Sequence, residues 1–294
     1  MLRTIRKSCS ATAFAAIGLT AAAAAETPPA QIAVSPSRVE VAVGGSPIDE
    51  SVRLFNFGDH DVSVSVSVAT WDLDEENRVR LVAPDEQSLD QWMVVTPLRF
   101  TVPAGESQVV RFSIRPRVRP TDGEHRAMIY FDQDLPAEEE ASMRVRFRVG
   151  VAVYGFAGEV ARTGELHALR TVAGENSMAA VLDVSSTGNA HVRFQGQYAI
   201  WPRDAFPGGE ATSTIDDLGE PGTELPGAIV EAGFLPSTPI LGGTRRELAF
   251  RGTGALAPGR YVLDLNGTLG GVAIDRSVEF VVPTSMVEVA STSR

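Results

Sequence analysis

The sequence predicts an all-β protein made of two immunoglobulin-like β-sandwich domains. Two observations carry this prediction: apolar and polar residues alternate over several short segments, and turn-forming residues separate those segments. No long segment has the periodicity of an amphipathic helix. Short strands separated by turns at such intervals are typical of β-sandwiches.

The clearest strand pattern of the first half lies over residues 61–68, where valines alternate with polar residues. A period of two is that of a strand with one buried face. The same alternation recurs over 110–114 and 145–153, and turn signals lie at 44–45, 57–59, 103–105 and 121–123. We therefore expect residues 26–154 to form the first sandwich.

Strand patterns resume after Gly155 and define a second sandwich over residues 155–284. The expected strands are 165–172, 178–185, 191–200, 228–234, 245–251, 261–265 and 272–282. Tyr261, which follows Pro-Gly-Arg, resembles the tyrosine corner of immunoglobulin-like sandwiches, and an ordinary half-buried tyrosine is the alternative. The Gly- and Pro-rich residues 202–226 predict a long loop, and residues 285–294 a flexible tail.

The first 25 residues have the pattern of a secretory signal peptide. Basic residues at positions 3, 6 and 7 precede an alanine-rich apolar stretch, and Ala23 and Ala25 form a cleavage site before Glu26. The alternative is a membrane anchor, but about fifteen mostly small residues are few for a bilayer span. The sequence therefore predicts an exported protein.

Removal of this segment changes the composition of the chain in two ways. It takes away Cys9 and Lys7, the only cysteine and the only lysine, so no disulfide or cysteine-based site is expected. It also leaves 23 basic residues against 37 acidic ones, a net charge of −14. A surface this acidic repels phosphate backbones, which argues against nucleic acid as a partner.

Residues that could carry chemistry form no recognisable constellation. The four histidines, His60, His125, His167 and His191, are scattered without metal-ligand spacing. Motifs for a serine nucleophile, a phosphate loop or a dinucleotide are missing. We therefore expect neither an enzyme nor a binder of a cofactor, a metal or a small-molecule substrate.

One acidic turn could bind a metal ion. Asp72, Asp74, Glu75 and Glu76 crowd four carboxylates into five residues, which could hold calcium weakly. The turn lacks the glycine and the terminal glutamate of an EF-hand, so a solvated turn is favoured.

Three segments of the first domain resemble PapD-like periplasmic chaperones, the family that assembles pili. Residues 32–41 form an apolar opening strand with a single arginine, Arg38. Residues 95–111 carry a proline, a Pro-Ala-Gly turn, a glutamine and Val-Arg in the family's order, and residues 123–131 resemble its penultimate strand. An acidic segment, 135–141, follows where the family has a mobile loop. The resemblance covers roughly the first domain.

This resemblance implies a function in the periplasm. Members of the family cap immature pilus subunits by donating a β-strand to an incomplete sandwich, so that backbone hydrogen bonds give affinity and alternate side chains fill a groove. The implied partners are subunits of a pilus or surface fibre, together with an outer-membrane usher. The alternative is a structural or adhesive envelope protein that keeps the chaperone-like fold without the carboxylate clamp.

The clamp is the first candidate site that the resemblance implies. Arg38 matches the family's arginine that anchors the C-terminal carboxylate of a subunit. The matching lysine is missing, because no lysine remains after cleavage, and Val151 falls at or near its position. Arg148 or Arg146 could substitute, since a guanidinium binds a carboxylate through two hydrogen bonds.

Two further departures concern the penultimate strand and the junction of the family's two domains. A glutamate expected ahead of the penultimate strand is displaced: Arg126 stands there, with Glu124 close by. The arginine that stiffens the junction is replaced by Gly155.

The donor strand is the second candidate site. Val145, Phe147 and Val149 alternate at the family's donor position and face either a subunit groove or the domain's own core, since both cases have the same period. The opposite row consists of arginines at 144, 146 and 148, which belong either to the partner site or to a solvated edge guarded by charge.

Overall fold

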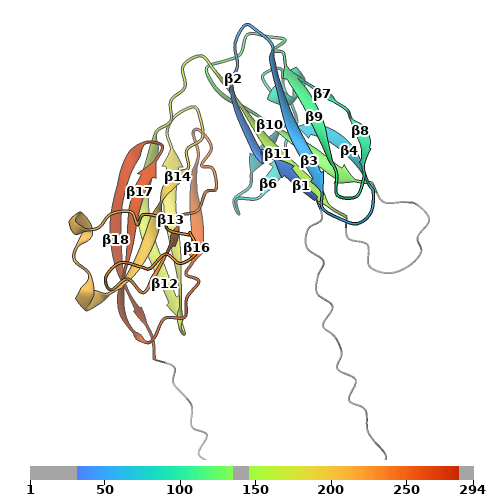
Figure 1. The fold of residues 1–294 in the computed structure, drawn as a ribbon. Helices are drawn as coiled ribbons and strands as arrows, with labels where there is room; N and C mark the ends of the chain where they lie inside the picture. Colours follow the sequence, from blue (N-terminus) through green and yellow to red (C-terminus); the bar gives the residue numbers. More distant parts are fainter. Residues whose placement is uncertain (1–31, 135–145, 285–294) are drawn as a thin grey trace, which may run out of the picture. The chain divides into compact units, whose positions relative to one another are not determined.

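The computed structural model describes residues 32–134 and 146–284 (Figure 1). The expected signal peptide and tail, the acidic segment 135–141, Arg144 and Val145 lie outside these residues. From Ile32 onward, contacts group the chain into one compact unit. Within the described part the chain is nearly all strand, and its helices are three short 3-10 turns, η1 (Leu89–Trp92), η2 (Arg203–Ala205) and η3 (Gly209–Ala211). None of the described helices is long and apolar enough to cross a bilayer.

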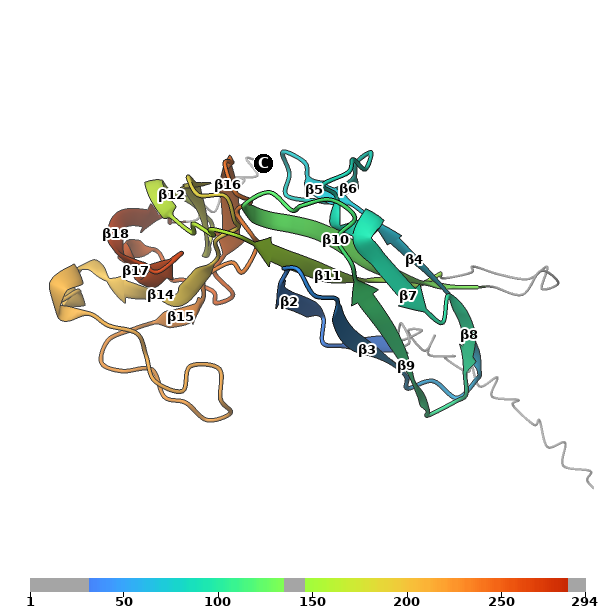
Figure 2. The same cartoon turned by 90° about the horizontal axis from the view of Figure 1, so that it is seen from above.

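The first half of the chain forms a sandwich of two sheets, seen from two sides in Figures 1 and 2. The four-stranded sheet has the order β1 (Ile32–Ser35), β3 (Ile48–Asn56), β9 (Ser107–Ile114) and β7 (Met93–Thr96). The five-stranded sheet has the order β2 (Arg38–Ala42), β11 (Arg148–Ala157), β10 (Gly123–Gln133), β4 (Val62–Ala69) and β8 (Arg99–Val102). Neighbouring strands are antiparallel except β2 and β11, which are parallel.

The core of this sandwich follows the alternation that the sequence shows. Val62, Val64 and Val66 of β4 are buried, while the serines between them point outward. Phe112 and Ile114 of β9 face them from the other sheet. Burial of each such side chain contributes roughly 1.5–3 kcal/mol, so the alternating rows supply most of the cohesion between the sheets.

The second half forms two further sheets around a separate core. One has the order β12 (Gly164–Gly174), β13 (Ser177–Ser186) and β16 (Arg245–Arg251), and the other β15 (Glu231–Phe234), β14 (Phe194–Pro202), β17 (Gly259–Leu269) and β18 (Val272–Val282). Leu182, Ile200 and Leu263 are fully buried between them. The all-β fold of two immunoglobulin-like sandwiches is thus confirmed.

Tyr261 forms the tyrosine corner that the sequence suggested. Its hydroxyl donates a hydrogen bond to the carbonyl oxygen of Ala257 at 2.9 Å, and its ring is buried. The expected long loop also exists, because no strand lies between Pro202, where β14 ends, and Glu231, where β15 begins.

Candidate functional site

β11 has one edge that is covered over only half its length. On one side it pairs with β10 from end to end, from Gly123↔Ala157 to Asp132↔Arg148. On the other side the parallel pairing with β2 begins only at Ala152↔Arg38 and continues to Phe156↔Ala42. Among the described residues, none pairs with residues 148–151 on that side. We call residues 148–151 the open edge; its outward backbone groups can pair with an added strand.

The open edge exists because the first segment of the chain changes sheets. β1 pairs with β3 in the four-stranded sheet, from Ile32↔Asn56 to Ser35↔Arg53. The chain then crosses over at Pro36, which has no N–H to continue the ladder. β2 joins β11 in the five-stranded sheet. Each half of this segment therefore covers only part of one sheet edge.

The apolar row of the expected donor strand passes from half-buried to fully buried. Phe147 and Val149 are partly exposed and pack against the first core, whereas Val151 and Val153 are completely buried. All four alternate on one face of the strand. Phe147 and Val149 therefore lie at the open end of the core, where an added strand would meet them.

Arg148 is engaged by a neighbour on β10. Its Nε and Nη2 donate hydrogen bonds to the two carboxylate oxygens of Asp132 at 2.6 and 3.1 Å. Its guanidinium lies 5.0 Å from the ring centroid of Tyr130. These hydrogen bonds and the charge of Asp132 raise the pKa of Arg148. Arg148 would have to leave Asp132 to bind another carboxylate through two hydrogen bonds.

Arg38 lies at the inner end of the open edge but away from Arg148. It stands opposite Ala152, so the residue beside it on β11 is Ala152; Val151 points into the core on the other face. Arg148 shares the face of Ala152 but lies four residues along the strand, about 13 Å away. The Arg38 side chain is 47% exposed, and its Nε lies 3.0 Å from Glu40 Oε1.

Arg146, the other candidate substitute for the lysine, is used locally. Its side chain is exposed, and its Nε donates a hydrogen bond to the carbonyl oxygen of Gln133 at 3.2 Å. The structure therefore brings neither Arg146 nor Arg148 to Arg38.

Other arginines, distant in sequence, lie beside Arg38 instead. A hollow of about 270 Å³ is lined by Arg38, Glu40, Arg162, His191 and Arg193, among others. The Nη2 of Arg193 donates to the hydroxyl of Tyr154 at 2.9 Å, and burial together with the charge of Arg38 lowers the pKa of Arg193. The Arg162 guanidinium lies 4.2 Å from the ring centroid of Phe156. Sequence reasoning did not find this cluster, because Arg162 and Arg193 lie more than a hundred positions from Arg38.

The displaced glutamate, Glu124, forms the most buried polar contact near this hollow. Its side chain is 1% exposed and accepts hydrogen bonds from the backbone N–H and the Nδ1 of His191, at 2.8 and 2.5 Å. Arg126 Nη1 lies 3.1 Å from its other oxygen. Burial favours the neutral acid, but the bonds and charge of His191 outweigh it and hold the pKa of Glu124 below its ordinary value.

The acidic turn is occupied by its own arginines and backbone. β5 (Trp71–Leu73) and β6 (Val79–Leu81) form a hairpin around it. Asp74 accepts hydrogen bonds from the N–H of Arg78 and of Glu76 and from the Arg78 guanidinium, and these bonds lower its pKa. Within residues 32–134 and 146–284, no group of three or more potential ligands is placed to hold a metal ion.

Comparison with known proteins gives a likeness of fold at low sequence identity. No protein-family model matches the sequence, and neither does any curated protein sequence. Among solved structures, the class 5 fimbriae chaperone CfaA is similar with a TM-score of 0.40 and 14% identity, over 86% of this chain and 100% of that one. The CupB2 chaperone of Pseudomonas aeruginosa is similar with a TM-score of 0.39 and 10% identity, over 85% and 100% of the two chains.

The chaperone DraB of E. coli is similar with a TM-score of 0.36 and 14% identity, over 85% of this chain and 98% of that one. These three are chaperones, the class that the sequence motifs also resemble. Because the TM-scores are low, we build the functional proposal on the strand geometry of this chain.

Proposed function

We propose that this protein is an exported, chaperone-like binding protein that holds a subunit of a pilus or surface fibre by β-strand addition. The observation that carries the proposal is the open edge of β11, which lies beside the half-buried Phe147 and Val149. A partner strand placed there would complete the sheet and cover these two side chains. The chain would act by binding, without catalysis.

The free energies involved indicate that backbone hydrogen bonds alone would not hold a partner strand tightly. Each ladder hydrogen bond contributes about 0.5–1.5 kcal/mol net, and four residues offer only a few outward groups. Covering the exposed remainder of Phe147 and Val149 adds part of the roughly 1.5–3 kcal/mol that full burial of each such side chain contributes. The apolar row therefore adds to the affinity of the ladder and gives it specificity, and Val145 belongs to the same proposed row.

A carboxylate anchor at the inner end of the open edge extends the proposal. Arg38 is partly exposed and lies with Arg162 and Arg193 around one hollow. A partner's C-terminal carboxylate bound there would be held by cations from three separate segments. Arg148 and its partner Asp132 lie near the outer end of the open edge, where the pair would border the added strand.

One observation favours the alternative, a structural or adhesive envelope protein without the clamp. Val151 lies in the core and Arg148 is bound to Asp132, so β11 offers no free cation beside Arg38. A protein of this kind would keep the sandwiches but would not release a captured subunit to an usher.

Co-purification with a matched pair of variants tests the proposal. The full chain is expressed in its host, recovered from the periplasm, and bound proteins are identified by mass spectrometry. Phe147→Ser should lose the subunit, whereas Phe234→Ser should retain it, because Phe234 is 60% exposed and lies on β15 of the second sandwich. Equal recovery by both variants would contradict strand addition at this edge.

A further inference from the structure

A second feature of the first sandwich lies between β9 and β10. Residues 115–120 read Arg-Pro-Arg-Val-Arg-Pro, and we call them the arginine segment. The three arginines are exposed, whereas the residues between them are partly buried and Val118 packs against the first core. The two prolines fix the backbone, so the arginines are presented from a stiff support.

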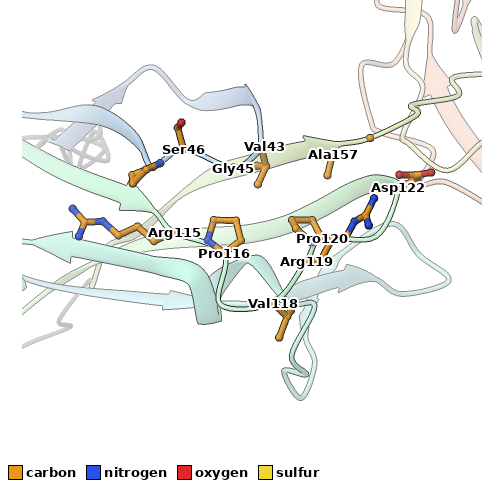
Figure 3. Close-up of a pocket in the computed structure, with 13 residues that line it drawn as sticks. Val43, Gly45, Ser46, Arg115, Pro116, Val118, Arg119, Pro120, Asp122 and Ala157 are labelled. Atoms are coloured by element: carbon orange, nitrogen blue, oxygen red, sulfur yellow. The ribbon is translucent and has the colours of Figure 1, made fainter.

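The arginine segment forms one wall of a hollow of about 450 Å³ (Figure 3). Arg115 and Arg119 lie toward its two ends, with the rings of Pro116 and Pro120 between them. The facing wall is made by residues 43–47, which connect β2 to β3. Gly44 and Gly45 have no other atom within 4 Å of where a Cβ would lie, so this wall is open to an incoming chain.

Arg117 extends the same surface to a neighbouring hollow. That hollow has a volume of about 420 Å³, and Val118 lines both. Val118 thus joins the two hollows, with Arg115 and Arg119 lining the larger one and Arg117 the smaller one.

Asp85 and Glu86 line the smaller hollow beside Arg117, so negative charge lies close to the arginine segment without forming an ion pair with it. Arg38, Arg126 and Arg148 of the same sandwich all have carboxylate partners. Arg115, Arg117 and Arg119 form no ion pair with any carboxylate of residues 32–134 and 146–284.

One acidic residue, Asp122, also lines the larger hollow. It lies against Gly158, where a Cβ would come within 1.8 Å of its Oδ1, and it forms no ion pair with Arg115 or Arg119. The larger hollow thus has two arginines and one carboxylate on its wall, in a chain with a net charge of −11.

We propose that the arginine segment and its hollow bind a short acidic segment of a partner protein. Guanidinium groups bind carboxylates through paired, charge-assisted hydrogen bonds. Side chains two residues apart in an extended peptide project from one face about 6.6 Å apart, so alternating acidic residues can reach successive arginines. The stiff, proline-held wall reduces the entropy lost on binding.

The net charge of the whole protein favours a short peptide over a larger anionic surface as the ligand of the arginine segment. A chain with a net charge of −11 is repelled by an extended anionic surface such as a bilayer, because many of its own carboxylates face that field. A short peptide meets mainly the local arginines. The site is separate from the open edge of β11 and uses different residues, so the inference stands independently of the proposed function.

Peptide titration with matched variants tests this inference. The probe is a fluorescein-labelled peptide with glutamate at alternate positions and serine between them, titrated into the full chain at low ionic strength. Arg115→Gln/Arg119→Gln should weaken its binding at least about 10-fold, the effect of losing one charge-assisted hydrogen bond. The control Arg251→Gln/Arg276→Gln removes equal charge from exposed arginines of the second sandwich and should change the affinity less than about 2-fold.

Two further measurements complete the test. One distinguishes a loss of charge from a loss of folding, and the other distinguishes a peptide ligand from a lipid surface. Arg115→Lys/Arg119→Lys keeps the charge and should recover part of the binding, and the melting temperature of every variant should equal that of the wild type. Equal loss in both glutamine variants, or no loss in either, would overturn the inference. Arginine-dependent binding to phosphatidylglycerol vesicles without binding of the peptide would overturn it in favour of a lipid surface.

Discussion

The two halves of β11 carry the same alternation of apolar and polar residues but have different surroundings. In the half that β2 covers, Val153 and Tyr154 are almost fully buried on opposite faces. In the open half, Phe147 and Val149 are only half-buried, and the Arg148 side chain is 56% exposed. Burial along this strand is therefore set by the neighbouring strand as well as by residue type, and the open half is where a partner can replace that neighbour.

The largest expected effect is that of Arg38, the proposed carboxylate anchor, which lies where the two halves of β11 meet. Arg38→Ala should weaken partner binding by roughly 2–5 kcal/mol, because it removes a cation from a carboxylate pair buried in the complex. The free energy of unfolding should change by less than about 0.5 kcal/mol, since Arg38 is about half exposed and pairs only with Glu40. Calorimetric titration with the isolated subunit measures the first, and chemical denaturation measures the second.

Arg53→Ala is the matched control for Arg38, because Arg53 is an exposed arginine on β3 of the other sheet. Its affinity for the subunit should equal that of the wild type. A loss as large as that of Arg38→Ala would show a general charge effect and remove Arg38 from the site.

Core substitutions compare the two halves directly. Val153→Ser should lower the free energy of unfolding by roughly 3 kcal/mol, because it leaves a cavity and a buried hydroxyl. Phe147→Ser should cost less, about 2 kcal/mol, since part of the Phe147 side chain is already exposed in the free protein. Urea denaturation of both variants gives the two values. If Phe147→Ser is as costly as Val153→Ser, Phe147 belongs to the domain's own core and the donor interpretation fails.

A smaller contrast lies between the polar contacts at the two ends of β10. His191→Ala removes a hydrogen bond to the buried carboxylate of Glu124 and should cost about 2 kcal/mol. Arg148→Ala breaks a pair in which the arginine side chain is 56% exposed and should cost about 1 kcal/mol. Thermal unfolding at neutral pH compares them. Equal losses of stability in the two variants would contradict the view that the Glu124–His191 contact stabilises the fold more than the Arg148–Asp132 pair.

The pH dependence of the free energy of unfolding tests whether the contact with His191 stabilises the ionised carboxylate of Glu124. Because the pKa of Glu124 is lowered in the folded state, its contribution is complete above the unfolded pKa of about 4.3 and is lost as pH falls through the lower folded value. Wild type should therefore lose stability below about pH 4 more steeply than His191→Ala. Parallel curves for the two proteins would show that His191 does not hold this carboxyl ionised.

The sequence predicted much of the fold because alternation reports burial directly. The valines of β4 and the tyrosine corner at Tyr261 were predicted correctly from local pattern alone. It could not fix register, since a shift of one residue moves a whole row to the other face. The sequence put Val151 at or near the position of the family's lysine, and the structure shows that Ala152 is the residue opposite Arg38.

The candidate site was harder to predict because it depends on contacts distant in sequence. The change of sheet between β1 and β2, which creates the open edge, has no signal beyond Pro36. Arg193 and His191 reach the surroundings of Arg38 and Glu124 only through the folded chain. Whether Phe147 and Val149 face a core or a partner could not follow from their period, and the structure shows that they touch the core while remaining partly exposed.

Hydrogen exchange along β11 tests the central claim most directly. In the free protein, outward-facing amides of residues 148–151 should exchange rapidly, whereas residues 152–156, paired with β2, should be protected. On addition of the purified subunit, residues 148–151 should become protected and residues 152–156 should not change. A bound subunit that leaves residues 148–151 as exposed as before would contradict strand addition at the open edge of β11.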